Sequence, residues 1–250
     1  MDFPSFFCVI LVYRLVVSPE QLSNGRIQLT TDQCHYLKRV LRFQDGDRFV
    51  AMDGNGQTWL AQLDQDQASL LNLLTESGEL STQVTLLVAL PKGSGFEEII
   101  RPCTELGVSH FMPVISDRTL LKPSPQKLER WQRIAQEAAE QSERQRVPTI
   151  SPTLTFAEAL IKLKDSGQIG YICVTRRNSP SFLSYLSTPL PETLLIATGP
   201  EGGWTDAEIE QAIAAGLTPV SLGNRILRAI TAPTVALALV AAVAEAYSSP

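Results

Sequence analysis

The chain has 250 residues, 44% of them hydrophobic, and this content can supply the cores of one large domain or two modest ones. Its formal net charge of −5 argues weakly against a nucleic-acid partner, although the distribution of charge matters more than the sum. The four cysteines (Cys8, Cys34, Cys103 and Cys173) form no CxxC pair and only two histidines accompany them, which argues against a metal site or disulfide framework and fits a cytoplasmic protein.

The amino-terminal third predicts a small β-rich domain. Residues 6–13 are apolar but too short to span a bilayer, and we interpret them as an extension or a mis-chosen start. Alternating runs predict strands at 26–29, 48–52, 58–63 and 69–73, with turns at Asp45-Gly46 and at 53–56. One helix is expected at 32–41. A polar connection ends this domain near residue 82, so the expected domains are 1–82 and 83–250.

From residue 84 the pattern changes to strands that alternate with helices. Strands are expected at 84–90, 111–115 and 170–174, and helices at 97–106 and 125–141. Such alternation indicates an α/β fold with a mainly parallel sheet. Residues 233–247 predict an apolar helix buried on all sides, either in a core or in a subunit interface.

The region between 194 and 223 predicts a strand, a glycine loop, a helix and a second strand. The loop is Gly199-Pro200-Glu201-Gly202-Gly203, and Thr205 and Glu208 have the spacing of a capping box before a helix at 206–215. A second loop, Leu222-Gly223-Asn224-Arg225-Ile226-Leu227-Arg228, follows the second strand. The first loop alone could be an ordinary connection. If the two loops end neighbouring parallel strands, they face one crevice, which favours a small-molecule site beside a cationic wall.

Basic residues form two groups. Lys38 and Arg39 lie in the predicted first helix and Arg42 directly follows it, and Lys38 and Arg42 have the i,i+4 spacing of one helical face. The second group is Arg118, Lys122, Lys127, Arg130, Arg133, Arg144 and Arg146. Both groups could be solvated surface, or they could contact RNA phosphates.

The motifs together resemble the bacterial ribosomal small subunit methyltransferase E family of the SPOUT superfamily. Besides the two glycine loops, matches occur at 90–93, 104–108, Glu140-Gln141 with Arg144, Val147-Pro148, and His35-Tyr36-Leu37 with 39–42. The chain departs from the family at Ile230, where a glutamate is usual, and at Pro102, where a lysine is usual.

The resemblance implies a SPOUT-type parallel sheet with a carboxyl-terminal trefoil knot, preceded by a PUA-like barrel. It also implies a homodimer with no membrane association and S-adenosylmethionine as cofactor. The implied cofactor-binding residues are Thr198, Gly199, Glu201, Gly202, Gly203, Leu222, Gly223, Ile226 and Leu227.

The family's reaction is methylation of uridine N3 in small-subunit (16S) ribosomal RNA, met on the 30S particle. N3 must lose a proton, and a fixed guanidinium would stabilise the resulting anion. Arg228 is the first candidate for this catalytic role and Arg225 the second. The implied RNA-binding residues are Arg14, Lys38, Arg39, Arg42, Lys92, Arg118, Arg144 and Arg146. Two alternatives remain: a non-catalytic ribosome assembly factor that retains the fold, and a nucleotide-dependent α/β enzyme, which would lack a phosphate-loop lysine.

Overall fold

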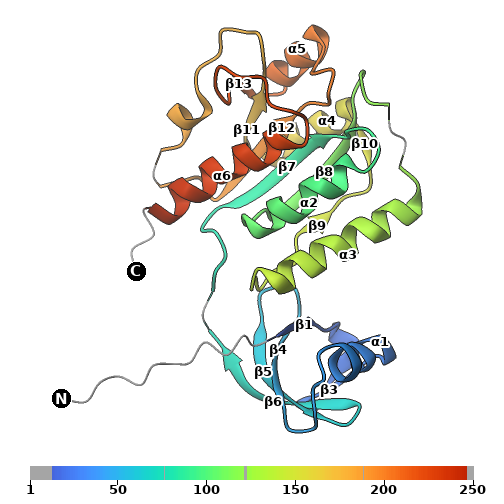
Figure 1. Cartoon of the computed structure of the whole chain (residues 1–250). Helices are drawn as coiled ribbons and strands as arrows, with labels where there is room; N and C mark the ends of the chain where they lie inside the picture. Colours follow the sequence, from blue (N-terminus) through green and yellow to red (C-terminus); the bar gives the residue numbers. More distant parts are fainter. Residues whose placement is uncertain (1–12, 76, 121–122, 188, 247–250) are drawn as a thin grey trace, which may run out of the picture. The chain divides into compact units, whose positions relative to one another are not determined.

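The computed structural model describes residues 13–75, 77–120, 123–187 and 189–246 (Figure 1). Most of the apolar run at 6–13, the cation Lys122 and the last residue of the predicted helix at 233–247 therefore lie outside the described residues. The chain divides into two compact units: one contains residues 1–78 and 143–146, and the other contains 79–142 and 147–250.

The first unit is a curled, six-stranded sheet with the order β1-β4-β5-β6-β3-β2 (Figure 1). The strands are β1 (Arg14–Val16), β2 (Leu22–Ser23), β3 (Arg26–Gln28), β4 (Arg48–Met52), β5 (Thr58–Asp64) and β6 (Gln67–Leu74). All neighbouring pairs are antiparallel except β1 with β4. The four predicted strands are confirmed, whereas β1 and β2 were not predicted because each is too short to show an alternating pattern.

The predicted helix of this unit is present, but it changes geometry halfway. Thr30 caps α1 (Thr31–His35) by accepting a hydrogen bond from the backbone N–H of Gln33. The chain then continues as a π-helix, η2 (Tyr36–Val40), closed by the bond from Leu41 N–H to the Tyr36 carbonyl at 3.0 Å. Wider turns of this kind are rare and recur at functional sites.

The second unit is built on a wholly parallel sheet of order β10-β8-β7-β12-β11-β13, with β9 paired to β8. Its strands are β7 (Gln83–Ala89), β8 (His110–Ile115), β9 (Thr149–Ile150), β10 (Leu154–Thr155), β11 (Ile169–Cys173), β12 (Thr193–Thr198) and β13 (Thr218–Val220). Its helices are α2 (Gly95–Glu105), α3 (Pro125–Gln141), α4 (Phe156–Ser166), α5 (Asp206–Ala214) and α6 (Thr231–Ala246). The predicted α/β class is confirmed. Among the described residues of this unit, the sequence analysis did not place α4, the 3-10 helix η3 (Phe182–Tyr185) or the two-residue strands β9 and β10.

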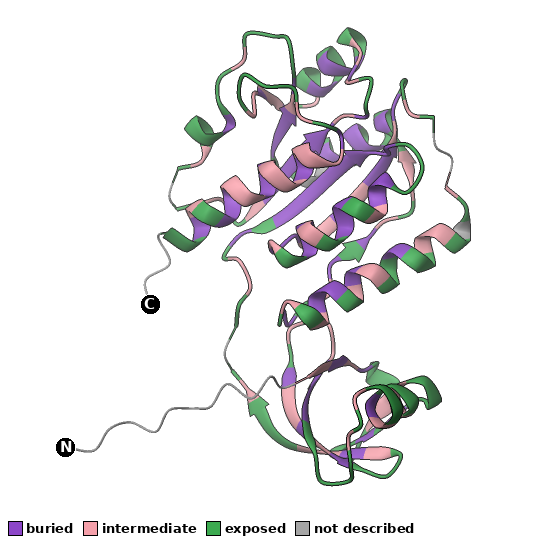
Figure 2. Cartoon of the chain, in the orientation of Figure 1, coloured by how far each residue is buried: buried purple, intermediate pink, exposed green. Residues whose placement is uncertain are grey.

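Both faces of this sheet are covered, so its strands carry apolar residues on both sides (Figure 2). Along β7, Val84, Leu86 and Val88 pack in one core with residues of α2, α3 and α6. Leu87 and Ala89 point to the other core, formed with α4 and α5. This alternation fixes which strand residues face which helix layer.

Within this chain the apolar carboxyl-terminal helix is buried on one side only, so the core alternative is wrong, and burial of the other side in a subunit interface stays a prediction. In α6, Ala236, Leu237 and Val240 are fully buried against the sheet core, whereas Ala242 is exposed. Among the described residues, no helix is long and apolar enough to cross a membrane.

Candidate functional site

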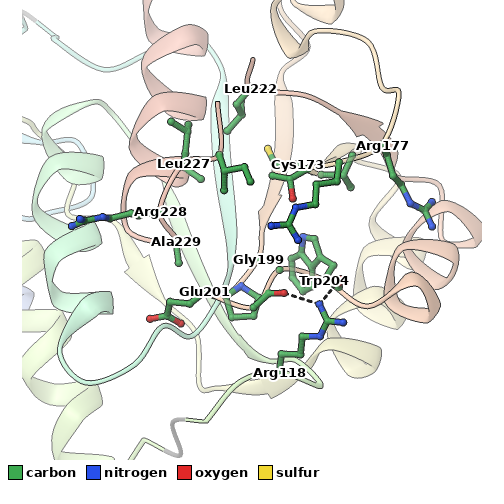
Figure 3. Close-up of a pocket in the computed structure, with 18 of the residues that line it drawn as sticks. Arg118, Cys173, Arg177, Gly199, Glu201, Trp204, Leu222, Leu227, Arg228 and Ala229 are labelled. Carbon is green, nitrogen blue, oxygen red and sulfur yellow. Dashed lines mark hydrogen bonds between the residues drawn. The ribbon is translucent and has the colours of Figure 1, made fainter. Parts of the chain in front are cut away.

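A cavity of about 770 Å³ opens beside the carboxyl ends of β11, β12 and β13, entirely within the second unit (Figure 3). Its volume lies in the range typical of small-molecule sites. Three loops line it: the glycine loop at 199–204, the arginine loop at 222–230, and the loop at 173–177 that follows β11. The carboxyl edge of a parallel sheet is where such folds bind ligands.

The glycine loop is a tight turn that lines the cavity and has open space beside Gly203. Gly203 donates its N–H to the Pro200 carbonyl at 2.8 Å and has a φ of +69°, a left-handed conformation that favours glycine. A Cβ atom added at Gly203 would meet no heavy atom within 4 Å. A Cβ at Gly199 would instead lie 3.2 Å from Nε1 of Trp204.

Side chains and backbone from neighbouring loops hold this turn from outside. The Lys92 backbone N–H donates to Oε1 of Glu201 at 2.9 Å, so Glu201, which we expected to bind the cofactor, also ties the glycine loop to the segment after β7. Arg118 donates through Nη1 to the carbonyls of Gly202 at 2.6 Å and Trp204 at 3.3 Å, shown as dashed lines in Figure 3. Charged donors of this kind form strong hydrogen bonds, so the loop is held rigidly.

The helix after the glycine loop begins with the predicted capping box. Thr205 caps α5, and the buried Glu208 accepts hydrogen bonds from the backbone N–H groups of Thr205 at 2.7 Å and Asp117 at 2.9 Å. The bond from Asp117 ties the end of β8 to the start of α5. The cap therefore also fixes the position of the loop before it.

The arginine loop provides apolar and cationic groups. Gly223 has a φ of +115°, and Ser221 accepts its N–H through Oγ at 3.1 Å. Leu222 and Leu227 line the cavity and are half-buried, whereas Ile226 is 64% exposed. Ile230, where the resembling family has glutamate, is half-buried against the apolar core and also lines the cavity.

The third loop was missed by the sequence analysis. We expected the strands before the two predicted loops to be neighbours, but β11 lies between β12 and β13. The end of β11 and the loop after it therefore add Cys173, Arg176 and Arg177 to the cavity wall. Only the spatial order of the strands could have identified it.

Two residues of this loop have defined electrostatic environments. Burial raises the pKa of the Cys173 thiol to about 12, so it stays neutral at physiological pH and is unsuited to act as a nucleophile. Arg177 forms ion pairs with Asp206 at 2.8 Å and Glu210 at 3.1 Å. Arg177 thereby links the β11 loop to α5.

The two candidate catalytic arginines, Arg225 and Arg228, both line the cavity and are exposed. Figure 3 shows the Arg228 side chain extending away from Cys173 and Trp204. Of the predicted cofactor-binding residues, all but one line the cavity. The exception is Thr198, which is fully buried at the end of β12 and is not part of the cavity wall.

Within residues 1–78 of the first unit, the predicted RNA-binding residues are either exposed to solvent or paired with a carboxylate of the same unit. Arg39 and Arg42 are exposed, whereas Lys38 approaches Asp66 at 3.5 Å and Arg14 pairs with Glu143 at 3.0 Å. The expectation that Lys38 and Arg42 share a helix face is wrong, because the helix ends at Val40 and Arg42 has a left-handed φ of +60°.

The remaining predicted cations are also distributed unevenly. Arg146 and Lys92 are exposed, but Arg144 is only 4% exposed, so an RNA phosphate could not reach its guanidinium without a local rearrangement. Arg118 is exposed, yet its guanidinium is engaged by the carbonyls of the glycine loop.

Comparison with known sequences identifies two domain families. The RNA methyltransferase domain family matches residues 78–241, and the RNA methyltransferase PUA domain family matches residues 29–70. The chain is 57% identical over 240 residues to a ribosomal RNA small subunit methyltransferase E from Synechocystis, with 94% of this chain and 79% of that protein covered. It is 32% identical to the Bacillus subtilis protein of the same name, covering 91% and 94% of the two chains.

Solved structures give the same result. A ribosomal RNA small subunit methyltransferase E from Neisseria gonorrhoeae, crystallised with S-adenosylmethionine, is 33% identical and has a TM-score of 0.82. The alignment covers 91% of this chain and 95% of that one. The likeness therefore extends over both units.

Proposed function

This chain belongs to the ribosomal RNA small subunit methyltransferase E family, and we propose that it methylates N3 of a uridine in small-subunit (16S) ribosomal RNA, with S-adenosylmethionine as the methyl donor. The observation that carries the proposal is the cavity at the carboxyl edge of the parallel sheet. Both motif loops on which the resemblance rested meet there.

The residues of the cavity fit this cofactor. Gly199, Gly202, Gly203 and Gly223 expose backbone groups, and next to Gly203 there is open space. Leu222 and Leu227 offer apolar surface for an adenine ring or a methionine chain. These residues, with Ile226 at the exposed edge, would hold the cofactor. When bound, S-adenosylmethionine supplies a methyl group already activated by its sulfonium.

The chain's own residues must activate the acceptor. Neutral uracil carries a proton on N3, and its loss spreads negative charge over N3 and both neighbouring carbonyl oxygens. A guanidinium remains charged at neutral pH and can face N3 and one carbonyl together. We assign this role to Arg228, which lines the cavity and is exposed, with Arg225 as second choice.

RNA contact is proposed for the first unit as well as for the catalytic unit. We propose that residues 1–82 form a PUA-like RNA-binding domain and 83–250 the methyltransferase domain, except that residues 143–146 pack with the first unit. The family matches at 29–70 and 78–241 support the nature of each domain. Exposed Arg39, Arg42 and Arg146 are the best candidates for phosphate contacts in the first unit. The target uridine must be unpaired to enter the cavity, which favours a single-stranded or remodelled site on the 30S particle.

Three further properties of the family are proposed here too. The carboxyl-terminal segment would form the trefoil knot, and the protein would act in the cytoplasm, where ribosomal RNA is modified in bacteria. It would also be a homodimer joined through α6. The partly exposed apolar side of α6, with Val235, Leu239 and Val243, supports the last proposal.

The test is incubation of the protein with labelled S-adenosylmethionine and 30S particles that lack the modification, followed by nucleoside analysis. We expect label in N3-methyluridine. Particles from a strain that already carries this methyl group are the matched control and should accept none. Cofactor binding without methyl transfer to any small-subunit RNA would contradict the enzymatic proposal and favour a non-catalytic assembly factor.

A further inference from the structure

Trp204 is the aromatic residue at the end of the glycine loop, between Gly203 and the helix cap Thr205. It is only 8% exposed, and its ring stacks on Phe156 with centroids 4.6 Å apart and an interplanar angle of 30°. Its carbonyl accepts a hydrogen bond from Arg118 at 3.3 Å. Both the ring and the backbone of Trp204 are therefore held in place by other elements of the same unit.

The indole N–H of this residue is buried, yet it has no hydrogen-bond partner among the described residues. Buried polar groups of proteins are almost always paired, and an indole nitrogen can only donate. Nε1 lies beside Gly199, where even an added Cβ would come within 3.2 Å of it. Trp204 and Gly199 both line the cavity, and Figure 3 shows the indole next to Gly199.

We propose that the indole N–H of Trp204 donates a hydrogen bond to an acceptor atom of bound S-adenosylmethionine. This inference rests on the cofactor assignment of the proposed function. RNA is a less suitable partner, because Trp204 is more than nine-tenths buried at the glycine loop. The cofactor offers a carboxylate, ribose hydroxyls and ring nitrogens as acceptors, and the glycine at position 199 leaves the indole nitrogen without a side chain between it and the loop backbone.

The test is calorimetric titration of the Trp204→Phe variant with S-adenosylmethionine. Phenylalanine keeps an aromatic ring against Phe156 but removes the donor. We expect the dissociation constant to rise by about threefold to tenfold, as for loss of one hydrogen bond. Trp131→Phe is the matched control, because Trp131 is 1% exposed in the core that contains α2 and α3 and does not line the cavity. That variant should bind as the parent does.

A second replacement separates the hydrogen bond from packing. Benzothienylalanine at position 204 retains the two-ring shape of tryptophan and replaces N–H by sulfur. It should weaken binding as much as phenylalanine does while leaving the melting temperature of the ligand-free protein unchanged. Methylthioadenosine, which lacks the amino-acid part, then locates the acceptor. If the variants at position 204 also bind methylthioadenosine more weakly than the parent does, the acceptor lies in the adenosine half of the cofactor. If they bind it as the parent does, the acceptor lies in the methionine half.

The outcomes also separate this inference from the proposed function. If the parent protein does not bind S-adenosylmethionine at all, the cofactor assignment itself fails. If the parent binds and the benzothienylalanine variant binds equally well, only the role of the Trp204 N–H is overturned.

Discussion

At the scale of single residues, the arginines around the cavity differ in what already holds them. Arg118 and Arg177 are engaged by carbonyls and carboxylates of the second unit. For Arg176, Arg225 and Arg228, no hydrogen bond or ion pair is found within the described part of the chain. A guanidinium without a protein partner is available to a substrate, which is why we place the catalytic role on the arginine loop.

Arg228→Ala should separate binding from chemistry. If the guanidinium stabilises the uracil anion, its contribution is larger in the transition state than in the ground state. We expect kcat at saturating RNA and cofactor to fall by about 10²–10³, as for loss of one charge-stabilising donor. Arg228→Lys should restore little of the lost kcat, since an ammonium cannot face N3 and a carbonyl oxygen together. Steady-state kinetics on 30S particles measure this.

Raising the pH gives a second measurement on the same variant. More of the uracil is then ionised, so Arg228→Ala should regain part of its rate. Arg101→Ala is the control, because Arg101 lies on α2 and pairs with Glu137 at 3.7 Å, and it does not line the cavity. A rise in KM with normal kcat for Arg228→Ala would show that Arg228 binds an RNA phosphate and does not stabilise the transition state.

At the scale of elements, the glycine loop depends on groups from three other segments. Lys92, Asp117 and Arg118 come from the ends of β7 and β8, and Glu208 comes from α5. The loop conformation is thus a property of the sheet edge as a whole. Local sequence defines only the turn itself.

Gly202→Val should disturb this arrangement and cofactor binding with it. An added Cβ would lie 3.0 Å from Cδ of Arg118, and the two methyl groups of valine add further bulk, so we expect Arg118 to shift and its 2.6 Å bond to the Gly202 carbonyl to weaken. At about one hundred times the dissociation constant, cofactor should stabilise the parent by roughly 2.7 kcal/mol, or on the order of 5–10 °C. The variant should lose most of this thermal shift.

Ala207→Val is the control for Gly202→Val. It adds two methyl groups at an exposed position of the first turn of α5, where they meet solvent. This variant should retain the full shift. If Gly202→Val also retains it, the glycine loop does not form the cofactor site.

Glu208→Ala should lower the stability of the second unit. The carboxylate is 3% exposed and accepts N–H groups from both Thr205 and Asp117, which the variant leaves unpaired. Buried donors without partners cost about 1–3 kcal/mol, which urea unfolding can measure. Glu158→Ala is the matched control, since Glu158 has the same capping-box position in α4 but is exposed. An equal loss in both variants would show that the Asp117 contact contributes nothing.

At the scale of the whole molecule, the net charge is negative, but the cations of the first unit are of two kinds. Some pair with carboxylates and others are exposed to solvent. Lys38, Arg26 and Arg14 of the first unit all have carboxylate neighbours. Arg39 and Arg42 are exposed on the turn that ends the π-helix. We therefore expect these two arginines, together with exposed Arg146, to provide the first unit's contribution to RNA affinity.

The double change of Arg39 and Arg42 to Ala should weaken RNA binding and reduce its dependence on salt. Each phosphate contact to single-stranded RNA contributes a slope of roughly −0.7 to the logarithmic salt plot, so the slope should flatten by about 1.4. Cofactor affinity should stay unchanged. Arg26→Ala, which removes a cation already paired with Asp64 at 3.1 Å, should leave the slope nearly as it is. An unchanged slope in the double variant would show that Arg39 and Arg42 are solvated surface residues that do not contact RNA phosphates.

The sequence by itself determined the α/β class, the small β-rich unit and most strand positions, because these depend on local periodicity and on turn residues. The same holds for the cap at Thr205 and Glu208, which is formed by residues three positions apart. Both glycine-bearing loops were identified as a ligand site from their composition and their family resemblance, and the structure brings them to one cavity.

Tertiary structure decided what depends on contacts between distant segments. The position of β11 between β12 and β13 added a third wall to the cavity, and no local pattern encodes strand order. Burial of Arg144, the engagement of Arg118 and the unpaired N–H of Trp204 likewise result from packing against residues far away in the chain. Sequence shows which groups are chemically able to bind, whereas only the fold shows which of them are already occupied by the protein itself.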